Sequence, residues 1–390
     1  MSRVKALVSC VALCFVATSS AAWADWATDV SAAKEAMKRK DYDTAIQIYT
    51  TELADHSLSQ NRRSIAHNNR GSAYSHKDLY DQALADFTEA LRLNPAFPEA
   101  HYNRGNDYAK KGLNDLAIAD YTEAVRQKPD NPNAFYNRGN VYVQKGQYDQ
   151  AIADYTEALR LKPDNQDALQ NRGAAFDQKG LYDEAVADLT EALRLRPEDP
   201  DAHSNRGFAY AHKGLYDRAL RDYTEAIRLK PDFTDAITNR GRTNLFRGDF
   251  KKAADDFARA LRDEPGDAYN VIWYYVALRR SGSDGARELT DAATHVTSPD
   301  WPKPIIDFYL GTVSRDRLVS AAGSLDAKKQ VDQQCEAWTY LAEADLMKGD
   351  ARSAAALFQQ AADKCPTDDE EKLLAEVELT RLQAALGHGR

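Results

Sequence analysis

The sequence of 390 residues predicts an all-α fold, a solenoid built from antiparallel helix pairs. The triplet Asn-Arg-Gly begins at positions 69, 103, 137, 171, 205 and 239, so it recurs every 34 residues. Each period also holds small and aromatic residues at helical spacing, and turn residues where helices should end. A fixed period of this length is typical of helical hairpins that bury their apolar faces by stacking on neighbouring hairpins.

The unit spanning residues 132–165 resembles the tetratricopeptide repeat (TPR). The resemblance rests on Phe135, Gly139, Tyr142, Ala151, Tyr155, Ala158 and Pro163. Gly139 lets the two helices approach closely, while Tyr155 fills the layer between them. Gly146 ends the first helix because glycine accepts a left-handed turn, and Pro163 cannot continue the second. The resemblance implies a right-handed TPR superhelical solenoid that holds partners on its concave face.

Residues 1–24 have the features of a secretory signal peptide. Arg3 and Lys5 form a basic start, a short apolar run follows, and an Ala-Trp-Ala sequence ends at Ala24. This pattern predicts cleavage after Ala24 and a periplasmic location. The residues before Cys10 also resemble a bacterial lipobox, so attachment to the outer membrane through a lipid on Cys10 stays open as an alternative.

The repeats divide the remaining chain into successive parts. An imperfect N-terminal unit covers 25–63 and ends in a polar insertion at 55–63. Six regular units follow, at 64–97, 98–131, 132–165, 166–199, 200–233 and 234–267. A degenerate repeat and the start of a proline-rich seam occupy 268–300. The seam covers 297–304, where three prolines in eight residues cannot all be helical.

Residues 301–390 are expected to form a C-terminal module. Short helices are predicted at 305–310 and 316–322, and the TPR pattern returns at 335–366. Thr367 and the acidic residues after it are typical of a helix start. We expect this last helix to close the open end of the array.

The C-terminal module resembles the NlpI-like periplasmic TPR lipoproteins. The matching stretches begin at Trp301 and comprise Asp307 to Gly311, Ser314, Leu318, Cys335 to Leu341, Lys348 to Asp350 and Ala355 to Phe358. The resemblance implies an adaptor that docks a C-terminal processing protease and presents peptidoglycan hydrolases to it. This chain differs in having more regular repeats and no clear lipidated cysteine, so membrane attachment is expected only if Cys10 is lipidated.

Two cysteines, Cys335 and Cys365, remain after cleavage of the signal peptide. In the repeat frame they occupy the start of a first helix and the end of a second, which antiparallel packing brings to one edge of the hairpin. Export to an oxidising compartment makes a disulfide plausible, worth roughly 3–4 kcal/mol. Two buried free thiols are the alternative.

The sequence gives little support for catalysis, for a cofactor or for nucleic-acid binding. The formal net charge is −9, and basic residues do not cluster. His67, His101 and His203 share one repeat position, where a structural role is expected rather than metal ligation. A glycan enzyme remains an alternative only if acids such as Asp167, Asp177 and Asp201 converge. A self-assembling structural array is another.

The asparagines of the triplet are the predicted peptide-binding residues. They should follow the concave face as a ladder of carboxamides, which can both donate to and accept from an extended peptide. The ladder comprises Asn69, Asn103, Asn137, Asn171, Asn205 and Asn239, and the groove around it Tyr102, Asn106, Lys110, Tyr136, Asn140, Gln144, Gln170, Gln178, Phe208 and His212. The alternative is that the amides bridge neighbouring repeats or are only solvated.

The arginine of each triplet has a structural interpretation. Each regular unit carries an aspartate on its second helix, so the arginine head is expected near that acid while its stem covers apolar surface. The arginines are Arg70, Arg104, Arg138, Arg172, Arg206 and Arg240, and the acids are Asp86, Asp120, Asp154, Asp188, Asp222 and Asp256.

Overall fold

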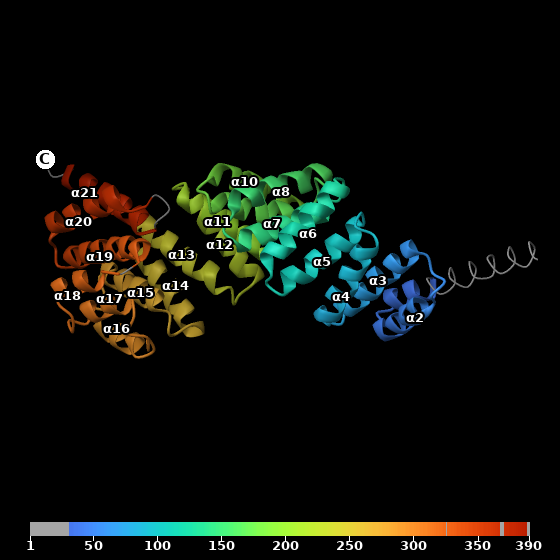
Figure 1. Cartoon of the computed structure of the whole chain (residues 1–390). Coiled ribbons are helices and arrows are strands. Elements are labelled where there is room, and N and C mark those ends of the chain that lie inside the picture. Colours follow the sequence, from blue (N-terminus) through green and yellow to red (C-terminus); the bar gives the residue numbers. More distant parts are fainter. Residues whose placement is uncertain (1–30, 325, 367–369, 388–390) are drawn as a thin grey trace, which may run out of the picture. The chain divides into compact units, whose positions relative to one another are not determined.

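The computed structural model describes residues 31–324, 326–366 and 370–387, and every regular element in these ranges is a helix (Figure 1). The prediction of an all-α fold of repeated helix pairs is therefore confirmed. Within the described ranges, no helix has the length and apolar character needed to cross a membrane. The proposed signal peptide and Cys10 lie outside the described residues.

The chain divides into two compact units, residues 1–172 and residues 173–390. In the first unit a helical stretch over 31–38 is followed by seven helices that contact their neighbours in chain order. They are α2 (Tyr42–Ala54), α3 (Gln60–Ser75), α4 (Tyr80–Leu93), α5 (Pro98–Lys110), α6 (Asn114–Gln127), α7 (Pro132–Gln144) and α8 (Tyr148–Leu161). The boundary between the units falls inside α9 (Gln166–Asp177).

The second unit contains the remaining helices. Five continue the regular repeats: α10 (Tyr182–Leu195), α11 (Pro200–His212), α12 (Tyr216–Leu229), α13 (Thr234–Arg247) and α14 (Phe250–Asp263). The others are α15 (Ala268–Arg280), α16 (Ala286–Ala293), α17 (Lys303–Tyr309), α18 (Arg315–Ala321), α19 (Ala327–Met347), α20 (Ala351–Lys364) and α21 (Glu370–Gly387).

The contact between α7 and α8 explains the glycine of the triplet. A Cβ atom on Gly139 would lie 2.8 Å from a ring carbon of Tyr155, so only glycine fits without movement. Tyr155 is buried, as is Ala151 on the same helix. At the end of α7 the chain turns at Gly146, whose φ angle of 68° is the left-handed conformation that favours glycine. These observations confirm the sequence interpretation of the repeat.

The triplet arginines join each repeat to the one before it. Arg104 donates two hydrogen bonds to Asp120, at 2.7 and 2.9 Å, and its third nitrogen donates to the hydroxyl of Thr88 at 3.2 Å. Thr88 belongs to the preceding repeat, so one side chain fixes both the hairpin and the stacking. The same pairing with an aspartate recurs at Arg70, Arg138, Arg206 and Arg240. The structural interpretation of these arginines is confirmed.

The histidines of the repeats are structural as well. His67, His101 and His203 contact the aspartates Asp86, Asp120 and Asp222 at 2.8, 2.9 and 3.3 Å. Each histidine therefore supports the acid that the arginine binds. No group of side chains with metal-ligand geometry occurs in the described residues.

For two helices, the start predicted from the sequence was wrong. Helix α19 begins at Ala327, where the side chain of Asp326 accepts from the backbone N–H groups of Lys328 and Lys329, and not at residue 335. The polar stretch after Asp326 contains good helix formers, and the TPR pattern alone could not reveal it. Similarly, α3 begins at Gln60, inside the predicted insertion 55–63.

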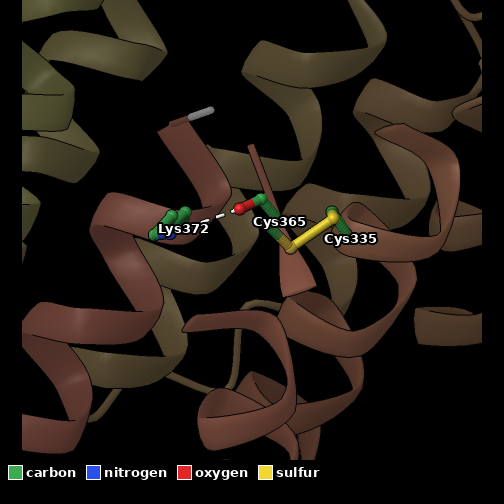
Figure 2. The surroundings of a disulfide bond; sticks show 3 residues. All are labelled: Cys335, Cys365 and Lys372. Carbon is green, nitrogen blue, oxygen red and sulfur yellow. Dashed lines mark hydrogen bonds between the residues drawn. A yellow bond between two sulfur atoms is a disulfide. The ribbon is translucent and has the colours of Figure 1, made fainter. Parts of the chain in front are cut away.

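The late start predicted for α19 also misplaced Cys335. This cysteine lies in the middle of the helix, and Cys365 caps the C-terminal end of α20. Their Cα atoms are 5.7 Å apart and the sulfur atoms form a disulfide (Figure 2). The carbonyl of Cys365 accepts a hydrogen bond of 3.3 Å from Lys372 on α21.

The last helix does more than cover an end, because it returns to a much earlier part of the chain. Arg381 donates to the carbonyls of Leu245 and Phe246 at the end of α13. Arg280 of α15 lies between two buried acids, Glu343 of α19 and Glu378 of α21, at 2.9 Å from each. Removing one partner from such a buried network would leave an uncompensated charge.

Candidate functional site

A cleft of about 460 Å³ in the first unit brings together several of the predicted groove residues. Its lining includes Asn103 and Asn106 from α5 and Asn137 and Asn140 from α7. Lys110 and Gln144, which lie at the ends of these two helices, complete the predicted part of the lining. The first helices of successive repeats therefore supply this cleft, as the TPR resemblance implies.

The ladder asparagines use their amide nitrogens to bridge neighbouring repeats. Asn137 Nδ2 donates to the hydroxyl of Tyr102 at 3.1 Å and to Asn106 Oδ1 at 2.8 Å. Asn171 Nδ2 makes the same two bonds to Tyr136 and Asn140, at 3.2 and 2.9 Å. The alternative reading of the ladder, in which the amides join repeats, therefore holds at these positions.

Asn103 makes a related bridge to the repeat before it, whereas Asn69 bonds to the residue next to it in the chain. Asn103 Nδ2 donates to Asn68 Oδ1 at 3.0 Å, one repeat earlier. Asn69 Oδ1 accepts from the amide of Asn68 at 3.2 Å. Asn69 does not line the cleft, so the structure does not place the whole predicted ladder in one site.

Buried tyrosines fix the direction of the amides in the cleft. The hydroxyl of Tyr121 donates to Asn106 Oδ1 at 2.7 Å, and that of Tyr155 donates to Asn140 Oδ1 at 2.7 Å. Asn106 and Asn140 therefore present their oxygens to the protein. Their Nδ2 groups make no hydrogen bond within the described residues, and the same is true of Asn137 Oδ1. The cleft thus keeps both donors and acceptors available.

Residues near the end of α3 contribute part of the cleft that the sequence did not predict. Ser72, Ser75 and His76 line it. Ser75 donates a hydrogen bond of 2.5 Å to Asp107, a fully buried acid whose second oxygen has no partner within the described residues. Burial raises the pKa of Asp107 above its usual value, although Ser75 opposes the shift.

Comparing repeats would have indicated Asp107 from the sequence. Its position is held by Ala73, Val141 and Ala209 in other repeats, so an acid there breaks the apolar pattern. Such departures from a local rule are expected at strained or functional sites.

One lysine lines the cleft. Lys110 is the only lysine or arginine among the described lining residues, and its ammonium lies 5.4 Å from the centre of the Tyr80 ring. No aspartate or glutamate lines the cleft among the described residues. The described lining is therefore polar, with one lysine and no carboxylate, and the buried carboxyl group of Asp107 lies against Ser75.

Two further ladder asparagines lack the bridging hydrogen bonds seen in the cleft. Asn205 on α11 and Asn239 on α13 are half-buried, and their side chains have no hydrogen-bond partner in the described residues. In the repeat before Asn239, the positions of Tyr102 and Asn106 are held by Ser204 and Phe208, which cannot make the same pair of bonds.

Two of the acids considered for a glycan enzyme, Asp167 and Asp177, lie apart on one helix. Asp167 and Asp177 lie near opposite ends of α9, ten positions apart, which corresponds to about 15 Å along a helix. Paired catalytic carboxylates need about 5–9.5 Å. Asp167 is exposed whereas Asp177 is buried. These two acids therefore do not form a catalytic pair.

Comparisons with known proteins identify the repeats. A family model described as a TPR repeat matches residues 105–146, 139–180 and 175–214, and one described as a tetratricopeptide repeat matches 64–97 and 200–233.

Solved structures with similar helical repeats are also found. YrrB, described as a TPR protein with an unusual peptide-binding site, is 26% identical over 48% of this chain and 95% of its own, with a TM-score of 0.45. A tetratricopeptide repeat protein from Parabacteroides merdae is 19% identical over 64% of this chain and 98% of its own, with a TM-score of 0.46. PilF of Pseudomonas aeruginosa is 19% identical over 55% of this chain and 96% of its own, also with a TM-score of 0.46.

Proposed function

Since this chain carries tetratricopeptide repeats over residues 64–97 and 105–233, we propose that it is a non-catalytic adaptor that binds an extended segment of a partner protein. The cleft lined by Asn103, Asn106, Asn137 and Asn140 is the binding site in this proposal. The observation that carries it is the set of unused amide groups in that cleft, with Lys110 as the only lysine or arginine among the described lining residues.

Amides suit this ligand because each residue of an extended peptide offers one N–H donor and one C=O acceptor. Asn106 and Asn140 offer free Nδ2 donors, and Asn137 offers a free Oδ1 acceptor. Main-chain recognition of this kind tolerates many side chains. Lys110 favours a segment with an acidic side chain or a C-terminal carboxylate near the end of α5.

The location and partners are further parts of the proposal. The resemblance of residues 301–390 to NlpI-like lipoproteins supports a periplasmic adaptor for a C-terminal processing protease and peptidoglycan hydrolases. The disulfide between Cys335 and Cys365 supports export, because disulfides persist in oxidising compartments.

Site-specific photo-crosslinking in a bacterial periplasm tests the proposed site. A benzophenone amino acid would replace Gln144, which is exposed at the cleft and whose side chain makes no hydrogen bond within the described residues. The matched control replaces Gln150, an exposed glutamine of α8 that does not line the cleft. We expect adducts with envelope proteins from position 144 and few from position 150.

A charge variant then links these adducts to the cleft. Lys110→Ala should lower adduct yield at position 144 by roughly threefold or more, since it removes the only lysine or arginine of the described lining. Lys162→Ala, at an exposed lysine outside the cleft, should have no effect. Equal adduct yields at positions 144 and 150 would contradict binding in the cleft. Adducts that include no protease or wall hydrolase would contradict the proposed partners.

A further inference from the structure

A second cleft, of about 740 Å³, lies in the C-terminal part of the second unit. It is formed by the start of α15, the connection between α16 and α17, the end of α18 and the N-terminal half of α19. None of its lining residues belongs to the asparagine cleft. Neither the repeat pattern nor the proposed function accounts for it.

Two aromatic side chains form a fixed wall of this C-terminal cleft. The indole N–H of Trp301 donates to Glu336 Oε2 at 2.8 Å, and the hydroxyl of Tyr269 donates to Glu336 Oε1 at 3.1 Å. Glu336 is 8% exposed, so this anchor lies beneath the surface. Both rings are half-buried and line the cleft, so they offer rigid apolar surface at low entropic cost.

The floor of the C-terminal cleft is one face of α19. Lys329, Asp332, Gln333 and Glu336 have the spacing i, i+3, i+4 and i+7, which places them along the same side of a helix. The side chains of Lys329, Asp332 and Gln333 make no hydrogen bond or ion pair within the described residues. By comparison, Arg228 on the second helix of a regular repeat pairs with Glu225 at 2.6 Å.

The charges lining the C-terminal cleft are mainly negative. Asp300, Asp332 and Glu336 supply three carboxylates, and Lys329 supplies the only ammonium among the described lining residues. Asp300 is exposed at the rim and accepts a hydrogen bond of 3.2 Å from Ser298. A positively charged ligand is therefore favoured over a negatively charged one.

From this arrangement we propose that the C-terminal cleft binds an arginine or lysine side chain of a partner protein. The aliphatic stem and the cationic head would lie against the rings of Trp301 and Tyr269, with the head paired to Asp332. Gln333 would accept or donate to the adjoining main chain. A neutral oligosaccharide could stack on the same rings, but it would gain nothing from the excess of carboxylates.

Calorimetric titration of the full chain with a defined probe tests the proposal. The probe is the peptide acetyl-Gly-Arg-Gly-Arg-Gly-amide, and the matched peptide carries citrulline, which keeps the shape of arginine without its charge. We expect the citrulline peptide to bind roughly tenfold more weakly, because charge-assisted pairs are the stronger ones. Asp332→Asn should weaken binding of the arginine peptide by roughly fivefold.

Controls separate this site from the general negative charge of the protein. Glu288→Gln removes one exposed carboxylate on α16, outside the cleft, and should leave binding unchanged. Trp301→Phe removes the indole donor and should weaken binding too. Because that change also disturbs an anchor, its circular dichroism spectrum must match the wild type before it is interpreted.

Each outcome decides the proposal. Equal binding of the two peptides, equal effects of Asp332→Asn and Glu288→Gln, or no binding at all would overturn it. Binding of chitotriose instead of the arginine peptide would show that the occupant is a glycan. Lys110→Ala should not affect the arginine peptide, so failure here and failure of the asparagine cleft are distinguishable.

Discussion

The aspartates of the second helices show how one neighbouring side chain changes the pKa of a buried acid. Burial disfavours the charged form of Asp86, but hydrogen bonds from Arg70 and His67 outweigh it and lower the pKa. At Asp154, Phe135 takes the place of the histidine, only Arg138 opposes the burial, and the pKa is raised. The histidine thus contributes to the lowered pKa of Asp86.

Asp177 of α9 is a buried acid with an unpaired carboxylate oxygen. It is 8% exposed, and its Oδ1 atom has no hydrogen-bond partner in the described residues. Burial raises its pKa to about 8. The next repeat has Ala211 at the equivalent position, so the fold does not require a carboxyl group there.

Replacing Asp177 with alanine should stabilise the protein in a pH-dependent way. Between the ordinary pKa of an aspartate and about 8, the folded state keeps a proton that the unfolded state has lost. The free energy of unfolding of the wild type therefore falls as pH rises through this window. We expect Asp177→Ala to add roughly 1–3 kcal/mol at pH 8 and less at pH 5, measured by urea unfolding.

The matched control for this prediction is Asp164→Ala, which removes an exposed aspartate. It should change stability little at either pH. A stabilisation by Asp177→Ala that is the same at pH 5 and pH 8 would show that the carboxyl group is not protonated in the folded state.

At the scale of the helices, two glycines of one hairpin have different physical roles. Gly139 lies where α7 meets α8, and Gly146 lies in the turn between them, with no atom within 4 Å of an added Cβ. The first regular repeat, 64–97, has Asp78 at the position of Gly146, with a φ angle of 58°. The turn therefore tolerates some residues other than glycine, whereas the helix contact does not.

Gly139→Ala should destabilise the protein although alanine is the better helix former. The new methyl group would overlap the ring of Tyr155, and such overpacking costs about 1–3 kcal/mol. After the propensity gain of about 1 kcal/mol, we expect a net loss of up to about 2 kcal/mol. Gly146→Asp, which reproduces the first repeat, should cost less. Thermal unfolding followed by circular dichroism measures both, and a larger loss for Gly146→Asp would refute this assignment of roles.

At the scale of the whole molecule, the contacts that recur in each repeat predict that one regular repeat can be removed. Deleting residues 98–131 would join Phe97 to Pro132 and bring Arg138 to the position that Arg104 occupies beside Thr88. Because stacked repeats contact mainly their neighbours, we expect the helicity per residue to persist with a modest loss of stability.

A shorter deletion provides the control. Removing residues 98–114 takes away α5 and the start of α6, which leaves the rest of α6 without its partner helix. Its helicity per residue and cooperativity should fall, as measured by circular dichroism during urea unfolding. If both deletions behave alike, the array does not behave as a sum of equivalent repeats.

The sequence by itself determined the repeated part of the fold, because its signals are local and recur. Gly139, Tyr155 and Gly146 define one hairpin, and the same pattern in each unit predicts the next. The pairing of arginine with aspartate followed from the same periodicity. The groove was predicted in part, since Asn103, Asn106, Asn137 and Asn140 line one cleft.

Only the tertiary structure decided how the side chains use their hydrogen-bonding groups. Asn137 Nδ2 donates to Tyr102 and Asn106 because α5 and α7 lie side by side. These bonds leave Asn137 Oδ1 and Asn106 Nδ2 available to a ligand. The return of Arg381 to α13 depends on contacts between residues distant in the sequence. A periodic pattern carries no information about such contacts, because they arise once, at a place where the period has ended.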